Sequence, residues 1–306
     1  MKTILTSLFI LLFFVSCSEN QMIEEENLHK YIKILASDEF EGREPGTKGG
    51  ERTKNYIKEH FEKLNLSPIS NQFLLEVPLS KMVVDLDKSY VNINDKSNIF
   101  NLIPGKEVVF WSKQVKETLE INSSDLIFIG YGIIAPEYEW NDYKNINVKG
   151  KTLVMLVNDP GFELKDPKLF KGKAMTYYGR WVYKFEEAAR QGAEAVLIIH
   201  ETEPASYPWQ VVETSWSGKQ IDLKRKNMGL DRIKLEGWIT STTAQKLFNN
   251  AGLDFNKLKK QALNKDFQAV PMSDLKLNAS INNIISFSIS HNIAAIKKGR
   301  KYPDEY

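Results

Sequence analysis

The sequence predicts an α/β fold, because apolar runs of strand length alternate with a segment of helical periodicity. Residues 151–161 (KTLVMLVNDPG) and 195–199 (AVLII) read as buried strands. The segment between them carries an apolar stripe at helical spacing, made of Trp181, Phe185, Ala188 and Ala189. Gly192 is suited to cap this helix. A strand, a helix and a strand in this order predict that the two strands pair in parallel.

Two helices are expected ahead of this unit. Apolar residues at helical spacing from Glu24 onward predict a helix of about three turns. Residues 38–51 contain one proline and several glycines, which indicates an irregular loop. From about Lys48 to Leu64 the helical spacing returns and predicts a second helix. Short apolar stretches then alternate with polar residues over 72–98, which is typical of strands.

The pattern continues to the end of the sequence. The run DLIFIGYGI from Asp125 predicts a buried strand that leads into a turn. One or two amphipathic helices are expected between residues 237 and 263. The final segment, residues 281–306, reads as a pair of strands.

The composition indicates an ordinary folded protein. Of 306 residues, 42% are hydrophobic and 26% are charged, which excludes collagen-like, coiled-coil, disordered and multi-span membrane classes. Forty-one Lys and Arg oppose 39 Asp and Glu, so the net charge is +2. The two signs are interspersed, and nucleic acid is therefore not an expected partner.

The amino terminus resembles an export signal. Residues 1–17 place Lys2 before an apolar run that is too short to cross a bilayer, so a retained transmembrane helix is the weaker interpretation. Ser16 followed by Cys17 is similar to a bacterial lipoprotein cleavage box. The resemblance implies that Cys17 carries a lipid, which predicts a membrane-anchored protein at the periplasmic or cell surface. Cys17 is also the only cysteine of the sequence, so no intramolecular disulfide is expected.

No catalytic or metal-ligating residue can be assigned from the sequence. The four histidines, His29, His60, His200 and His291, do not form a ligand pair; a zinc ligand at His200 is conceivable because it ends a strand. Gly130, Gly132 and Ala135 match a dinucleotide fingerprint, but Pro136 and a turn follow where that motif needs a helix. Ser217 lacks the glycine that would precede a nucleophile elbow.

Aromatic side chains are a further candidate for a binding surface. Packing in the core is the favoured interpretation for these residues. They are Tyr177, Tyr178, Trp209 and Trp216.

Four stretches, in order, resemble the exported zinc aminopeptidases of the aminopeptidase Y and glutamate carboxypeptidase type, metallopeptidase family twenty-eight, in the branch with a protease-associated domain. Residues 35–66 (LASDEFEGREPGTKGGERTKNYIKEHFEKLNL) resemble the start of the peptidase domain. The inserted protease-associated domain is resembled by IFIGYGIIAPEYEWNDYKNINVKGKTLVMLVNDPG at 127–161 and MTYYGRWVYKFEEAARQGAEAVLIIHETEPASYPW at 175–209. Residues 290–306 (SHNIAAIKKGRKYPDEY) resemble the strand that leads into the active site.

This resemblance implies a domain organisation. Residues 1–17 form the signal peptide, 18–85 the amino-terminal part of a peptidase-like domain and 276–306 the first strands of the same, incomplete domain. Residues 86–275 form the α+β insert, expected as a small, partly open barrel with a helix alongside. The insert is expected to fold on its own, and the flanking pieces are expected to be marginally stable.

The resemblance implies peptides or proteins as partners, and two zinc ions in full-length members of the family. In such enzymes the strand after the Pro-Asp-Glu-Tyr region ends in a His-x-Asp pair that ligates zinc, and this sequence ends at Tyr306. We therefore expect the chain as given to be inactive. It is interpreted as the amino-terminal fragment of such a metallopeptidase. Alternatives are a non-catalytic peptide- or protein-binding lipoprotein, or one half of an enzyme assembled from two chains.

Overall fold

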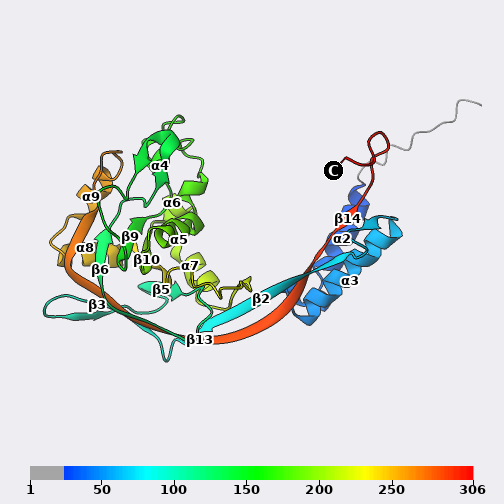
Figure 1. Ribbon diagram of the computed structural model, residues 1–306, viewed down its shortest axis with the longest axis horizontal. Coiled ribbons are helices and arrows are strands. Elements are labelled where there is room, and N and C mark those ends of the chain that lie inside the picture. Colours follow the sequence, from blue (N-terminus) through cyan, green and yellow to red (C-terminus); the bar gives the residue numbers. More distant parts are fainter. Residues whose placement is uncertain (1–23, 306) are drawn as a thin grey trace, which may run out of the picture. The chain divides into compact units, whose positions relative to one another are not determined.

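The computed structural model describes residues 24–305, which form two compact units (Figure 1). Unit 1 contains the described residues up to Glu76 and those from Ser290 onward. Unit 2 contains residues Val77–Ile289. The proposed signal peptide and Cys17 lie outside the described residues. No helix within 24–305 combines the length and the apolar character that crossing a membrane requires.

Unit 1 is built around two helices. Its elements are α2 (Glu25–Leu35), the 3-10 helix η1 (Asp38–Arg43), α3 (Lys48–Lys63), β1 (Ser67–Pro68) and β14 (Ala295–Ile296). Strands β1 and β14 pair in antiparallel fashion. Helix α2 contains no buried residue, and Phe40 and Gly49 are the buried residues among those described in this unit. Both predicted helices are confirmed, but their apolar faces contribute little to a core.

The glycine-rich segment is more regular than expected. Gly49 and Gly50 lie in the first turn of α3 instead of a loop. A Cβ on Gly49 would lie 2.1 Å from the Phe40 carbonyl oxygen, and one on Gly50 would lie 2.4 Å from the Glu44 carbonyl oxygen. The glycines therefore allow the preceding segment to pass close to the helix. In the sequence alone they indicate only an irregular loop.

Unit 2 is a mixed sheet with helices on both sides. Its strands are β2 (Leu74–Val84), β3 (Tyr90–Asn94), β4 (Ile99–Asn101), β5 (Val108–Trp111), β6 (Thr118–Phe128), β7 (Ile134–Ala135), β8 (Trp140–Asn141), β9 (Thr152–Leu156), β10 (Ala195–His200), β11 (Gln220–Leu223), β12 (Leu235–Thr240) and β13 (Val270–Ile293). Its helices are η2 (Pro136–Tyr138), α4 (Pro160–Leu164), η3 (Tyr177–Gly179), α5 (Trp181–Arg190), α6 (Thr202–Ala205), α7 (Trp209–Trp216), α8 (Ser241–Asn250) and α9 (Phe255–Gln261). The α/β class is confirmed.

The order of the main sheet is β11-β2-β13-β6-β9-β10-β12-β5; β3 also pairs with β13, and β4 pairs with β3. Strands β6, β9, β10 and β12 are parallel to one another, as predicted for β9 and β10, whereas β5 and β13 run antiparallel to their neighbours. The strand order does not close on itself, so the sheet is open instead of the partly open barrel that we expected. The central strands are continuous apolar runs. Such strands are buried on both faces, which suits a parallel sheet covered by helices on its two sides.

Alternate residues of the central strands build two separate cores. Along β10, Leu197 belongs to one core and Ile198 to the other, and both are fully buried. Helices α8 and α9 complete the first core, and α5 and α7 complete the second. Figure 1 shows these helix pairs on opposite sides of the strands. Helix α5 has Gln191 as its C-cap residue, and Gly192 follows with φ 79°, in the left-handed region that ends the helix as predicted.

The predicted pairing of two strands at the carboxyl terminus is wrong. Residues 270–293 form one continuous strand, β13, and the short β14 pairs with β1. Asn282 and Asn283 lie within this strand, and their side chains bond to neighbouring segments. The Asn282 side-chain amide donates to the Lys88 carbonyl at 2.6 Å, and that of Asn283 donates to the Lys116 carbonyl at 2.9 Å.

Strands β2 and β13 each continue from one unit into the other. The compact units therefore divide at 76/77 and 289/290, whereas the sequence placed boundaries at 85/86 and 275/276. The assignment of these parts to a peptidase-like domain and a protease-associated insert stays a prediction.

Candidate functional site

The parallel strands of unit 2 present their carboxyl ends at one edge of the sheet. Strand β10 ends at His200, which Glu201 follows, and β12 ends at Thr240, where α8 begins. In open α/β sheets this edge is the usual place for a ligand, because the loops there leave a crevice between neighbouring strands. The edge is therefore the first place to look for a binding site.

A pocket of about 500 Å³ lies at this edge. It is lined by residues from α4, β10, α6, α7, the start of α8 and α9, so elements distant in sequence converge on it. The lining residues are Glu163, His200, Glu201, Thr202, Glu203, Pro204, Trp209, Thr240, Ser241 and Lys259. Three carboxylates and one ammonium give the lining a net negative charge.

His200 is the buried polar side chain of this pocket, with 5% of its surface exposed. Its Nε2 lies 3.0 Å from the Tyr207 carbonyl oxygen, and its ring packs near those of Trp209 and Trp238. Burial lowers the pKa of His200, so the ring is neutral at pH 7. A carbonyl only accepts hydrogen bonds, so Nε2 carries the proton and Nδ1 is left as an acceptor.

Lys259 joins two of the carboxylates in the pocket. Its ammonium lies 2.7 Å from Glu201 Oε1 and 3.3 Å from Glu163 Oε1. Burial lowers the pKa of Lys259, but the hydrogen bonds and charges of Glu201 and Glu163 outweigh this effect and the net pKa is raised. The lysine is therefore charged at neutral pH and holds α9 to α4 and to the end of β10.

A second polar cluster is buried in the loops of unit 2. The fully buried Lys184 donates to the Tyr131 carbonyl at 2.6 Å, and burial lowers its pKa to about 7. Burial raises the pKa of Asp142 to about 7 and also raises that of Asp159. Asp159 accepts from the Thr176 hydroxyl at 2.7 Å. These groups have protein partners and fix the loops.

The dinucleotide fingerprint has a structural role. Gly130 and Gly132 have φ near 65°, and β7 follows them instead of a helix. A Cβ on Gly132 would lie 2.9 Å from Met155 Sδ, and one on Gly130 would lie 3.1 Å from the Phe267 ring. Close packing and a left-handed backbone conformation explain why both positions are glycine. A bound phosphate is not needed to explain them.

The other histidines belong to unit 1 and are not among the residues that line the pocket. His29 faces Glu25 on the exposed surface of α2 at 3.4 Å. His60 Nδ1 contacts the Tyr56 carbonyl at 2.8 Å within α3. His291 follows in β13 within unit 1, and its buried Nδ1 has no hydrogen-bond partner.

The residues that the structure describes do not fit a zinc centre. Over positions 24–305, no three His, Cys, Asp or Glu side chains are grouped so that they could hold a metal ion. The pocket at His200 brings carboxylates near an imidazole, but Lys259 already occupies the space between two of them. No step through zinc is therefore derived for this part of the chain.

The aromatic candidates divide between core and surface. Trp209 and Trp216 pack against one core and Tyr178 against the other. Tyr177 is 54% exposed and donates to Glu186 Oε2 at 2.6 Å. Trp209 also lines the pocket. Ser217 is the residue after α7 and has no base beside it among its described hydrogen bonds.

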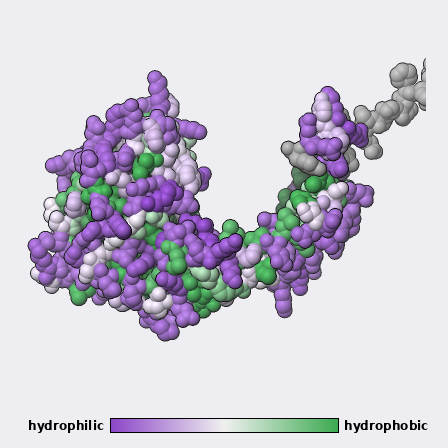
Figure 2. Space-filling model, in the orientation of Figure 1, coloured by the Kyte–Doolittle hydropathy of each residue, from purple (hydrophilic) through white to green (hydrophobic). Residues whose placement is uncertain are grey.

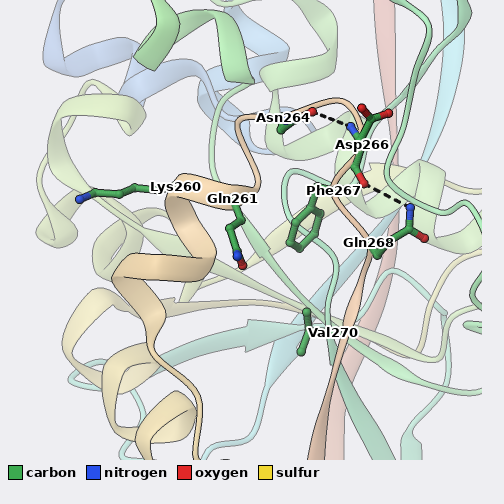
Figure 3. A pocket seen from close by; sticks show the side chains of 7 residues that line it. All are labelled: Lys260, Gln261, Asn264, Asp266, Phe267, Gln268 and Val270. Atoms are coloured by element: carbon green, nitrogen blue, oxygen red, sulfur yellow. Dashed lines mark hydrogen bonds between the residues drawn. The ribbon is translucent and has the colours of Figure 1, made fainter.

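Figure 3 shows a second pocket, of about 520 Å³, at the end of α9. It is lined by Lys260, Gln261, Asn264, Asp266, Phe267, Gln268 and Val270. All of these belong to one continuous segment. The Asn264 side chain accepts from the Asp266 amide, and the Asp266 carbonyl accepts from the Gln268 side chain. The polar groups here shape a turn, so this pocket is the weaker candidate.

The sequence marks His200 as a conceivable zinc ligand, but it does not identify the residues that share the pocket with it. Glu163 and Lys259 are almost a hundred residues apart, and nothing in their local sequence marks them. The available signal was positional. Residues that directly follow buried parallel strands converge at one edge, and this rule would have selected Glu201 and the start of α8.

Comparisons with known proteins place few limits on function. No family model and no curated protein matches the sequence. A solved structure described as BSAP, a zinc aminopeptidase from Bacillus subtilis, matches with 13% identity and a TM-score of 0.33. The match covers 89% of this chain and 47% of that one, so the chain spans about half the length of this neighbour. At this identity and TM-score, the similarity does not support any statement about the activity of this chain.

Proposed function

We propose that this chain is the peptide-binding, non-catalytic portion of an exported protein of the zinc-aminopeptidase type. The observation that carries the proposal is the polar pocket at the carboxyl edge of the parallel strands, lined by His200, Glu201 and Lys259. Hydrogen-bonding groups beside Trp209 suit a ligand that combines a polar backbone with side chains. The four resembling stretches support peptides as the ligand class.

In this proposal the chain binds peptides and does not hydrolyse them by itself. The test uses the pure protein and a mixture of tripeptides of varied side chains, some with free and some with blocked ends. Binding is followed by tryptophan fluorescence, because Trp209 lies in the pocket wall. We expect saturable binding at micromolar to millimolar concentration. Absence of binding by every peptide up to millimolar concentration contradicts the proposal.

Hydrolysis is measured in the same samples after addition of zinc. We expect no release of amino-terminal residues. A release that persists in pure, resequenced material would show that the chain carries its own catalytic centre.

The relation to a complete peptidase is tested at the level of the gene. Reading all three frames beyond the Tyr306 codon distinguishes the two main interpretations. A frame that continues into a His-x-Asp strand supports the fragment of a zinc metallopeptidase. A stop codon followed by unrelated sequence favours the non-catalytic binding lipoprotein.

A further inference from the structure

We propose that the pocket at His200 recognises a primary ammonium group of the peptide, either the free α-amino terminus or a lysine side chain. This inference rests on the proposed function and specifies which part of the peptide the site reads. Its basis is a buried acceptor in the wall, a surplus of carboxylates and an ammonium of the chain that already occupies part of the site.

The buried acceptor is His200 Nδ1. The ring is 5% exposed, and its Nε2 is committed to the Tyr207 carbonyl. None of the described side-chain hydrogen bonds involves Nδ1, and the residue lines the pocket. A neutral imidazole in this tautomer accepts one hydrogen bond and donates none at Nδ1. A ligand at this point must therefore be a donor.

The charges of the pocket select a cationic donor. Glu163, Glu201 and Glu203 oppose Lys259, so an anion is repelled and a cation is attracted. The ring of Trp209 lies in the wall beside His200, with centroids 5.6 Å apart. Its indole N–H is committed to the Gly105 carbonyl at 2.6 Å. An aromatic wall without a free donor is compatible with a cation.

Lys259 shows that these carboxylates bind an ammonium. Its Nζ takes one oxygen from each of two side chains, Glu201 Oε1 and Glu163 Oε1. Each carboxylate keeps a second oxygen, and Glu203 forms no described ion pair. A peptide ammonium has three donors, and the imidazole nitrogen and the carboxylates of this lining are acceptors for such donors.

The first test compares blocked and free amines. The probes are tri-alanine, N-acetyl-tri-alanine and N-acetyl-Ala-Lys-Ala-amide, each titrated into the full chain by calorimetry. We expect acetylation to weaken binding of tri-alanine about tenfold or more, because it removes the charge and two donors. Restored binding by the acetylated lysine peptide identifies a lysine side chain as the source, and no restoration identifies the amino terminus. Equal affinity for free and acetylated tri-alanine overturns the inference.

The second test uses variants with opposite expected signs. His200→Gln keeps an N–H donor for Tyr207 and removes the acceptor at Nδ1, so we expect about five- to tenfold weaker binding of tri-alanine. Lys259→Met frees two carboxylates, so binding is expected to strengthen severalfold. Glu117→Gln, an exposed charge outside the pocket, is the matched control and is expected to change nothing.

Weaker binding by Lys259→Met, or unchanged binding by folded His200→Gln, overturns the inference. If His200→Gln does not fold, as judged by circular dichroism, the comparison of Lys259→Met with acetylated probes decides. If no peptide binds at all, the proposed function fails. If peptides bind with no dependence on the amine, only the present inference fails.

Discussion

At the scale of the single residue, Lys184 is a fully buried lysine of unit 2. Its side chain is fully buried, its ammonium donates to the Tyr131 carbonyl, and Asp142 and Asp159 favour its charged form. Burial nevertheless lowers its pKa from 10.5 to about 7. The unfolded chain therefore binds one more proton than the folded chain between these two values, and stability must rise with pH across that interval.

This linkage predicts a measurable pH dependence. Between pH 7 and 9.5, where tyrosines of the unfolded chain are still neutral, we expect Lys184 to add about 1.4 kcal/mol of unfolding free energy per pH unit. Lys184→Met removes this slope. The measurement is urea denaturation at several pH values, with the exposed Lys173→Met as control. A difference between wild type and Lys184→Met that does not change with pH contradicts the assignment.

Cys17 carries the prediction on localisation, which comes from the sequence alone. In cells supplied with radioactive palmitate, we expect label in the protein and its recovery with membranes. Cys17→Ala is expected to lose both the label and the membrane association, with Ser18→Ala as the neighbouring control. Label retained by Cys17→Ala refutes the lipoprotein interpretation.

At the scale of the element, the sheet shows what a sequence pattern can and cannot predict. The unbroken apolar run of β10 predicted a buried parallel strand, and the structure confirms it. The pattern could not identify the pocket, because Glu163 and Lys259 meet only after α4 and α9 have packed. The length of β13 was missed for a related reason. The bonds of Asn282 that keep it in the strand lead to residues almost two hundred positions away.

The two-faced burial of β10 gives a prediction of its own. Leu197 and Ile198 are adjacent and point to opposite cores, and both are fully buried. We expect Leu197→Ala and Ile198→Ala each to lower the unfolding free energy by about 2–5 kcal/mol. Ile289→Ala, at a half-exposed position of β13, is the control and is expected to cost much less. The measurement is chemical denaturation. Tolerance at either Leu197 or Ile198 would mean that one face of this strand is not covered by helices.

At the scale of the whole molecule, the two units differ in how much apolar surface they bury. Unit 2 has a core on each face of its sheet. Unit 1 exposes Leu28, Ile32 and Leu64 on its helices, and 64% of the surface of Ile32 remains accessible. Figure 2 shows hydrophilic residues over most of the visible face of unit 2, and hydrophobic residues at the surface along β2 and β13. A helix without a buried face gains little stability from packing.

This contrast predicts the outcome of limited proteolysis. We expect trypsin to cleave first in the segments before Val77 and after Ile289, and to leave a resistant fragment close to unit 2. Mass spectrometry of the fragments identifies the ends, and the fully denatured chain is the control. A resistant core that retains α2, α3 and β14 would show that unit 1 is as stable as unit 2.

Strands β2 and β13, through which the chain enters and leaves unit 2, are neighbours in one sheet. The Asp85 amide donates to the Asn282 carbonyl at 2.8 Å, so the two passages lie about one strand spacing apart, roughly 4.8 Å. A hairpin of a few residues is enough to bridge such a gap. The two ends of unit 2 therefore lie close enough that a short turn would span the distance between them.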